Sequence, residues 1–217
     1  VLLRQELVGT RPLFIAVAYL VAAAALFEIG AAIRNQPLRT EAYFAAFIAF
    51  MSALFYNHRP GVPLWFLSER LVTLAICGGT LFYLFARIKV LATKEASPLF
   101  GFETEVLWKG SGPAVGAFLS FLATVLVIVL IHTELVEYAP LFIAVCFMAF
   151  AVVLLESGIC WRGPPLRVLG AGMALLAFCW ALAYNVMQAA DFETIPRLLS
   201  LALVTVGFYY FYERLYR

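Results

Sequence analysis

The sequence predicts an all-α integral membrane helical bundle. Three observations predict it: an excess of apolar residues, seven apolar runs of spanning length, and an internal repeat. Of the 217 residues, 65% are hydrophobic and 13% are charged. Soluble domains carry about 45–50% apolar and about 25% charged residues, so a soluble core of this size could not bury so much apolar surface. The net charge of +2, without basic runs that carry interleaved aromatics, indicates no nucleic-acid partner.

Seven stretches reach or approach the roughly 20 apolar residues that a transmembrane helix needs. They are Pro12–Ile33, Leu38–Tyr56, Leu64–Val90, Pro113–Leu135, Tyr138–Ile159, Leu166–Val186 and Ile195–Arg214. None alternates apolar with polar residues, which excludes a transmembrane β-barrel and leaves helices as the way to satisfy backbone polar groups in lipid. We expect Leu91–Gly112 to be a loop at the headgroups, because Trp108 and Lys109 favour that layer.

A tandem repeat runs through the chain. A shift of 128 residues lays Val1–Val17 over Val129–Val145, and the match continues without a gap. The matched charged pairs are Glu28 with Glu156, Arg34 with Arg162, Arg39 with Arg167 and, after one deletion, Arg70 with Arg197 and Arg87 with Arg214. Apolar composition alone does not place charges in register. The repeat unit contains four predicted helices, an even number, so the copies should run parallel.

The repeat predicts the domain organisation. Residues 1–11 correspond to the end of a preceding helix and its outer segment, residues 12–136 to a first four-helix repeat, and residues 137–217 to three helices of a second repeat. The chain is therefore expected to be the C-terminal part of a longer array.

The distribution of basic residues predicts the orientation. One side holds ten of them: Arg34, Arg39, Arg87, Lys89, Lys94, Lys109, Arg162, Arg167, Arg214 and Arg217. The other side holds five: Arg4, Arg11, Arg59, Arg70 and Arg197. Because Lys and Arg are enriched in cytoplasmic loops, the ten-residue side and the C-terminus should be cytoplasmic.

Each repeat places one glutamate inside a predicted span, where an ionisable group is expensive and indicates a function. Glu28 precedes the end of its helix by about 6–8 Å, and Arg34, Arg39 and Arg87 fall at the same inner face. We call these four residues, with their counterparts Glu156, Arg162, Arg167 and Arg214, the inner clusters.

One interpretation of the inner clusters is a structural ion pair, a clasp that holds three helix ends together. In it Arg39 or Arg87 pairs with Glu28, and Arg167 or Arg214 pairs with Glu156. The other interpretations are an anion or lipid-headgroup site and a proton-coupled carboxylate.

A second polar set, the outer cluster, falls at the opposite helix ends. Its members are Asn57, Glu69, Arg70, Asn185 and Arg197. Anchoring at the membrane interface is the simpler interpretation of these residues, and a functional site is the alternative.

Motifs of common enzymes are missing from the sequence. There is no GxSxG, no HExxH, no P-loop and no glycine-rich dinucleotide turn. Asp191 is the single aspartate, so no paired-aspartate metal site is possible. We expect no metal and no cofactor, and an enzyme is the least favoured class.

The closing stretch resembles the C-terminus of a known family. Pro165-Leu166-Arg167, Arg197-Leu198-Leu199-Ser200 and Tyr210-Phe211-Tyr212-Glu213-Arg214 are similar to segments of large bacterial many-helix membrane proteins of unknown function. That resemblance implies a multi-helix architecture in a bacterial inner membrane and no particular activity. The expected function is transport or translocation of a lipid or envelope-related substrate. The alternative is a non-catalytic scaffold or accessory subunit of a larger membrane complex. Expected partners are membrane lipids, other membrane subunits or further repeats of the same chain.

Overall fold

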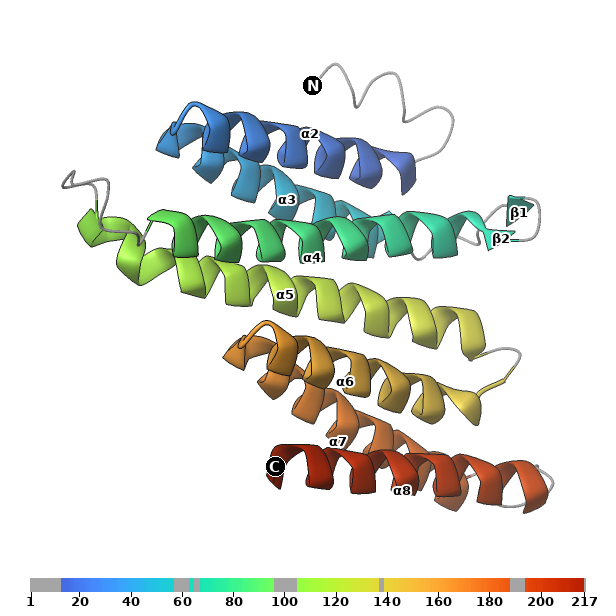
Figure 1. Cartoon of the computed structure of the whole chain (residues 1–217). Coiled ribbons are helices and arrows are strands. Elements are labelled where there is room, and N and C mark those ends of the chain that lie inside the picture. Colours follow the sequence, from blue (N-terminus) through green and yellow to red (C-terminus); the bar gives the residue numbers. More distant parts are fainter. Residues whose placement is uncertain are drawn as a thin grey trace. The chain divides into compact units, whose positions relative to one another are not determined.

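The computed structural model describes residues 13–56, 63–64, 67–95, 105–136, 139–187 and 194–216. Within these stretches the fold is helical, with one short hairpin (Figure 1). The helices are α2 (Leu13–Ala32), α3 (Gln36–Tyr56), α4 (Glu69–Glu95), α5 (Glu105–Leu135), α6 (Phe142–Cys160), α7 (Pro164–Met187) and α8 (Thr194–Tyr216). The strands β1 (Pro63–Leu64) and β2 (Leu67–Ser68) pair antiparallel between α3 and α4.

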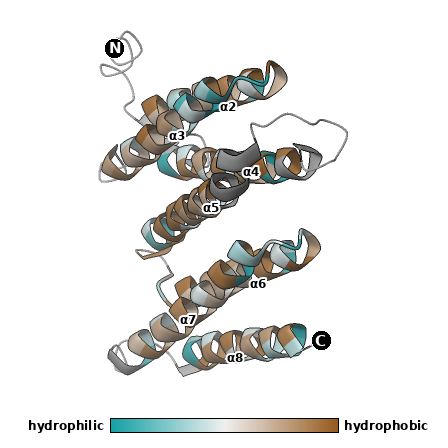
Figure 2. Cartoon of the chain, turned by 90° about the vertical axis from the view of Figure 1, so that its left-hand side faces the viewer, coloured by the Kyte–Doolittle hydropathy of each residue, from teal (hydrophilic) through white to brown (hydrophobic). Residues whose placement is uncertain are grey.

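All seven of these helices are long and apolar enough to cross a membrane. Figure 2 shows the hydrophobic colours spread along the helices. The predicted apolar core of every span is therefore helical. A hairpin so short was not expected, because two-residue strands leave no periodic pattern in a sequence.

The expected loop over Leu91–Gly112 is wrong in its bounds. The helix α4 continues to Glu95 and α5 already begins at Glu105, so Trp108 and Lys109 lie in α5. Hydropathy marks where the apolar window ends, whereas a helix continues as long as residues with good helix propensity follow. The residues Ala92, Lys94 and Glu95 are of this kind.

The chain divides into two compact units, Val1–Leu130 and Ile131–Arg217. In the first unit α2 and α3 form a helical hairpin, α4 packs on both helices, and α5 runs beside α4 in the opposite direction (Figure 1). In the second unit α6 and α7 form a hairpin, and α8 packs on both.

Small residues allow the helices of each hairpin to approach closely. On α3, four alanines at heptad spacing are almost completely buried: Ala42, Ala46, Ala49 and Ala53. On α7, Ala174, Ala177 and Ala181 are buried in the same way. In membranes, close backbone approach of this kind replaces the hydrophobic effect as a source of helix association.

Candidate functional site

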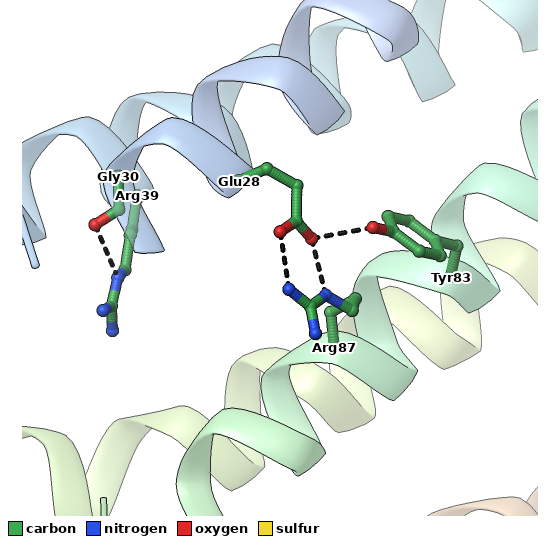
Figure 3. Close-up of polar contacts among 5 residues, drawn as sticks. All are labelled: Glu28, Gly30, Arg39, Tyr83 and Arg87. Carbon is green, nitrogen blue, oxygen red and sulfur yellow. Dashed lines mark hydrogen bonds and ion pairs between the residues drawn. The ribbon is translucent and has the colours of Figure 1, made fainter. Parts of the chain in front are cut away.

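The first inner cluster joins α2 to α4 through Glu28. The Nε and Nη2 atoms of Arg87 donate to the two carboxylate oxygens of Glu28, both over 2.6 Å (Figure 3). The hydroxyl of Tyr83, one helical turn before Arg87, donates to Oε1 of the same carboxylate over 2.7 Å. Both charged side chains are about one-third exposed, at 35% for Glu28 and 34% for Arg87. Two parallel charge-assisted bonds fix geometry as well as supplying energy.

The second inner cluster has the same arrangement between α6 and α8. Arg214 donates from Nε and Nη2 to Glu156 over 2.7 and 2.9 Å. The hydroxyl of Tyr210 donates to Oε1 of Glu156 over 2.5 Å. Each carboxylate thus receives two bonds from a guanidinium and one from a phenol.

The turn after α2 is a Schellman motif closed by arginine. The amide of Asn35 donates to the carbonyl of Gly30 over 2.9 Å, and the amide of Arg34 donates to that of Ala31 over 3.4 Å. These are the two bonds that define the motif. Arg34 lies between them with a φ of 54°, a left-handed conformation that usually belongs to glycine.

The turn after α6 repeats this geometry. Gly163 donates to the carbonyl of Gly158 over 2.8 Å, Arg162 donates to that of Ile159 over 3.1 Å, and Arg162 has a φ of 49°. The left-handed conformation costs about 1–2 kcal/mol for a residue with a Cβ. Both turns therefore hold arginine at a position where glycine would be less strained.

The remaining arginines of the inner clusters bind the ends of the preceding helices. Arg39 Nε donates to the carbonyl of Gly30 over 3.2 Å (Figure 3), and Arg167 Nε donates to that of Gly158 over 3.1 Å. Each of these carbonyls also accepts the longer Schellman bond of its turn, from Asn35 or Gly163, so it receives two hydrogen bonds at the helix end. A cation at this end also compensates the negative pole of the helix dipole.

The next helix approaches closely at Gly30 and Gly158, and most closely at Gly158. A Cβ on Gly158 would lie 2.8 Å from Arg167 Cγ and 2.9 Å from the Arg167 backbone nitrogen. A Cβ on Gly30 would lie 3.1 Å from the equivalent atoms of Arg39. At Gly158 an added Cβ would therefore force the start of α7 and the arginine to shift, whereas at Gly30 the fit is tight.

The outer cluster is described only in part. Arg197 in α8 donates from Nη2 to the backbone carbonyl of Asn185 over 2.6 Å and from Nε to its Oδ1 over 3.3 Å. This contact joins the end of α7 to the start of α8. Arg70 lies at the start of α4, and Asn57 and the side chain of Glu69 fall outside the described residues.

The structure divides the predicted inner clusters into two kinds of contact. Glu28 with Arg87 and Glu156 with Arg214 form ion pairs. Two arginines, Arg34 and Arg162, are the left-handed residues of the turns. Arg39 and Arg167 donate to the carbonyls at the helix ends. The two tyrosines, Tyr83 and Tyr210, were not among the residues predicted for the clusters. Their signal was present, because each precedes its arginine by four residues and so shares one helix face with it.

The chemistry of the inner clusters is that of an anchored carboxylate. Both oxygens of each glutamate accept hydrogen bonds from a permanently charged guanidinium, so the group is held in place and its charge is balanced. Elsewhere in the described stretches, no three His, Cys, Asp or Glu side chains gather closely enough to hold a metal ion.

Comparison with known proteins gives no match, whether to a family model, a curated protein or a solved structure. The resemblance to large bacterial many-helix membrane proteins therefore stays a prediction.

Proposed function

We propose that this chain is a non-catalytic scaffold or accessory subunit of a larger membrane complex. In this proposal it is built from parallel tandem repeats of a four-helix unit and lies in a bacterial inner membrane with its C-terminus in the cytoplasm. The main support is that each of the two glutamates accepts hydrogen bonds from one arginine and one tyrosine in the same arrangement. A carboxylate that works in transport has to exchange its partners, and catalytic or transport sites are seldom equally developed in two copies.

The matched local geometry supports the repeat. The ion pairs, the left-handed arginines and the arginine bonds to glycine carbonyls recur at equivalent positions. So does a hydroxyl bond at the start of the third helix of each unit, where Thr73 donates to the carbonyl of Arg70 and Ser200 to that of Arg197. Independent sequences would not arrive at all of these contacts in register.

Transport of a lipid or envelope-related substrate is the competing proposal. Its support is the charge of the inner clusters, each of which has three arginines to one glutamate. Such an excess suits an anionic headgroup. The two proposals differ in what they expect from a neutral glutamate variant.

The test is a double-mutant cycle on Glu28 and Arg87 in purified protein in bicelles. A scaffold predicts that Glu28→Gln and Arg87→Gln each lower the free energy of unfolding, with a coupling of about 1–2 kcal/mol, because charged hydrogen bonds are lost from a partly exposed pair. The charge-swapped variant, Glu28→Arg with Arg87→Glu, should recover part of the loss. If Glu28→Gln unfolds like the unmodified protein and the coupling is zero, the structural role is wrong and transport gains support.

A further inference from the structure

The ion pair of the second unit uses only one of the three arginines in its inner cluster. Arg214 pairs with Glu156, and Arg167 makes one side-chain bond, from Nε to the Gly158 carbonyl. Arg162 makes no side-chain hydrogen bond or ion pair with the part of the chain that the structure describes. No acidic residue follows Glu156 before Arg167. The turn after α6 therefore carries positive charge that its own residues do not balance.

The left-handed backbone at Arg162 gives the fold nothing that glycine would not give. Its φ is 49°, and both Schellman bonds of the turn come from backbone amides, which glycine also has. Backbone strain persists at positions with a role. Because the side chain is what glycine lacks, the role of Arg162 lies in its guanidinium. Arg162 is exposed, and so is Arg34, the equivalent residue of the first unit.

In a membrane, the turn after α6 falls at the level of the lipid headgroups. The apolar window of α6 ends at Cys160, directly before Trp161, which is 48% exposed. Tryptophan and arginine together are typical of the membrane interface. The helix α7 begins with Pro164 and Pro165, which have no amide hydrogen to offer an anion. Recognition of an anion at this turn therefore falls to side chains.

Arg167 brings a second guanidinium to the same turn. Its Nε donates to the Gly158 carbonyl, and the amide of Gly163, the residue after Arg162, donates to that carbonyl as well. The guanidinium of Arg167 is therefore anchored beside the backbone of the turn. Its two Nη atoms make no hydrogen bond with the described residues. Guanidinium donors lie in a planar fork that matches the oxygens of a phosphate.

We propose that Arg162 and Arg167 bind the phosphate of an anionic phospholipid headgroup. The bilayer supplies phosphate at this depth, and arginines clustered at a membrane surface attract negatively charged headgroups. The lipid is a resident ligand of the turn and not a transported substrate, so its binding is independent of whether the chain is a scaffold. Trp161, next to Arg162 in the chain, lies at the same level and can report on the lipid that occupies the site.

Quenching of Trp161 fluorescence by brominated lipids tests the proposal in the full chain. Trp65, Trp108 and Trp180 are replaced by phenylalanine, so that Trp161 is the single reporter. The protein is reconstituted in vesicles that contain brominated phosphatidylglycerol or brominated phosphatidylcholine with the same acyl chains. The ratio of the two quenching efficiencies measures the preference for the anionic headgroup. We expect a preference of about fivefold, the change that one basic residue gives at an anionic surface.

Two neutral variants remove the guanidinium without straining the turn. Arg162→Gly and Arg162→Asn both fit a left-handed backbone, and each should abolish the preference. Arg34→Gly is the matched control, because it removes the same charge from the equivalent turn of the first unit. With that variant Trp161 should keep the full preference. Survival of the preference in both Arg162 variants would overturn the proposal.

The remaining outcomes separate the lipid from other anions. Equal quenching by the two lipids without any change at Arg162 overturns the proposal and favours an acidic segment of another protein as the partner. A loss with Arg34→Gly as large as with Arg162→Gly overturns it too, because the preference then comes from overall charge. Excess inorganic phosphate should act no differently from chloride at equal ionic strength. If phosphate alone abolishes the preference, the site takes a free anion and the lipid proposal is wrong.

Discussion

Arg34 and Arg162 hold backbone conformations that arginine rarely adopts, with φ values of 54° and 49°. Strain of this kind persists only where the surroundings determine it, and it is concentrated at positions with a role. Here each arginine ends one helix by a Schellman turn and adds positive charge at the same helix end. In the proposed orientation that charge lies on the cytoplasmic side, where Lys and Arg are enriched.

Arg162→Gly should raise the free energy of unfolding relative to Arg162→Ala by about 1–2 kcal/mol. Both variants remove the guanidinium, but only glycine removes the left-handed penalty. Denaturation by sodium dodecyl sulfate in bicelles measures the difference. Equal stability of the two variants would show that the backbone at position 162 is not left-handed.

Little of this residue-scale detail could be predicted from the sequence. The glutamates and arginines could be assigned to one membrane face, because charges at helix ends are conspicuous in apolar surroundings. The arginine that pairs with Glu28 could not be predicted, because Arg39 and Arg87 are both expected at the same membrane face as Glu28. The structure shows that Arg87 makes the ion pair and Arg39 binds the Gly30 carbonyl.

At the scale of elements, each helical hairpin is closed by a glycine near the end of its first helix. The bond from Arg167 to the Gly158 carbonyl and the close approach at the Gly158 Cα occur at the same point. The start of α7 is thereby held against the end of α6. The equivalent contact between Gly30 and Arg39 holds α3 against α2.

Gly158→Ala should destabilise the protein by about 1–3 kcal/mol, because the added methyl group would overlap the backbone of α7. Gly172→Ala is the matched control, since a Cβ there meets no atom within 4 Å and alanine favours the helix by about 0.5–1 kcal/mol. Thermal unfolding in the same detergent compares the two. Opposite signs for the two substitutions are expected, and a stabilising Gly158→Ala would contradict the close contact.

The existence of the helices was predictable from the sequence, but their ends were less so. The predicted third span began at Leu64, whereas α4 begins at Glu69 after a short hairpin. Hydropathy averages over a window and does not register a turn of a few residues. The helix α5 begins at Glu105, eight residues before the predicted apolar run at Pro113. Hydropathy marks the apolar part of a helix and not its first residue.

Within the described residues, seven helices are long and apolar enough to cross a membrane, and the orientation that we propose for them rests on the distribution of basic residues. A cysteine at Lys94, near the end of α4, should resist a membrane-impermeant maleimide in intact bacterial cells. A cysteine at Arg59 should react, because that position is expected outside. Both should react after permeabilisation, and labelling at position 94 in intact cells would contradict the proposed topology.

We propose that the chain repeats one helical unit in parallel, with a glutamate held by an arginine at the same end of each copy. An experimentally determined structure of the protein in lipid nanodiscs would show whether it does. We expect α2–α4 to superpose on α6–α8 by a rotation about an axis near the membrane normal, with Glu28 lying on Glu156 and Arg87 on Arg214. A superposition that inverts the membrane plane, or that displaces these residues by a helical turn, would contradict it.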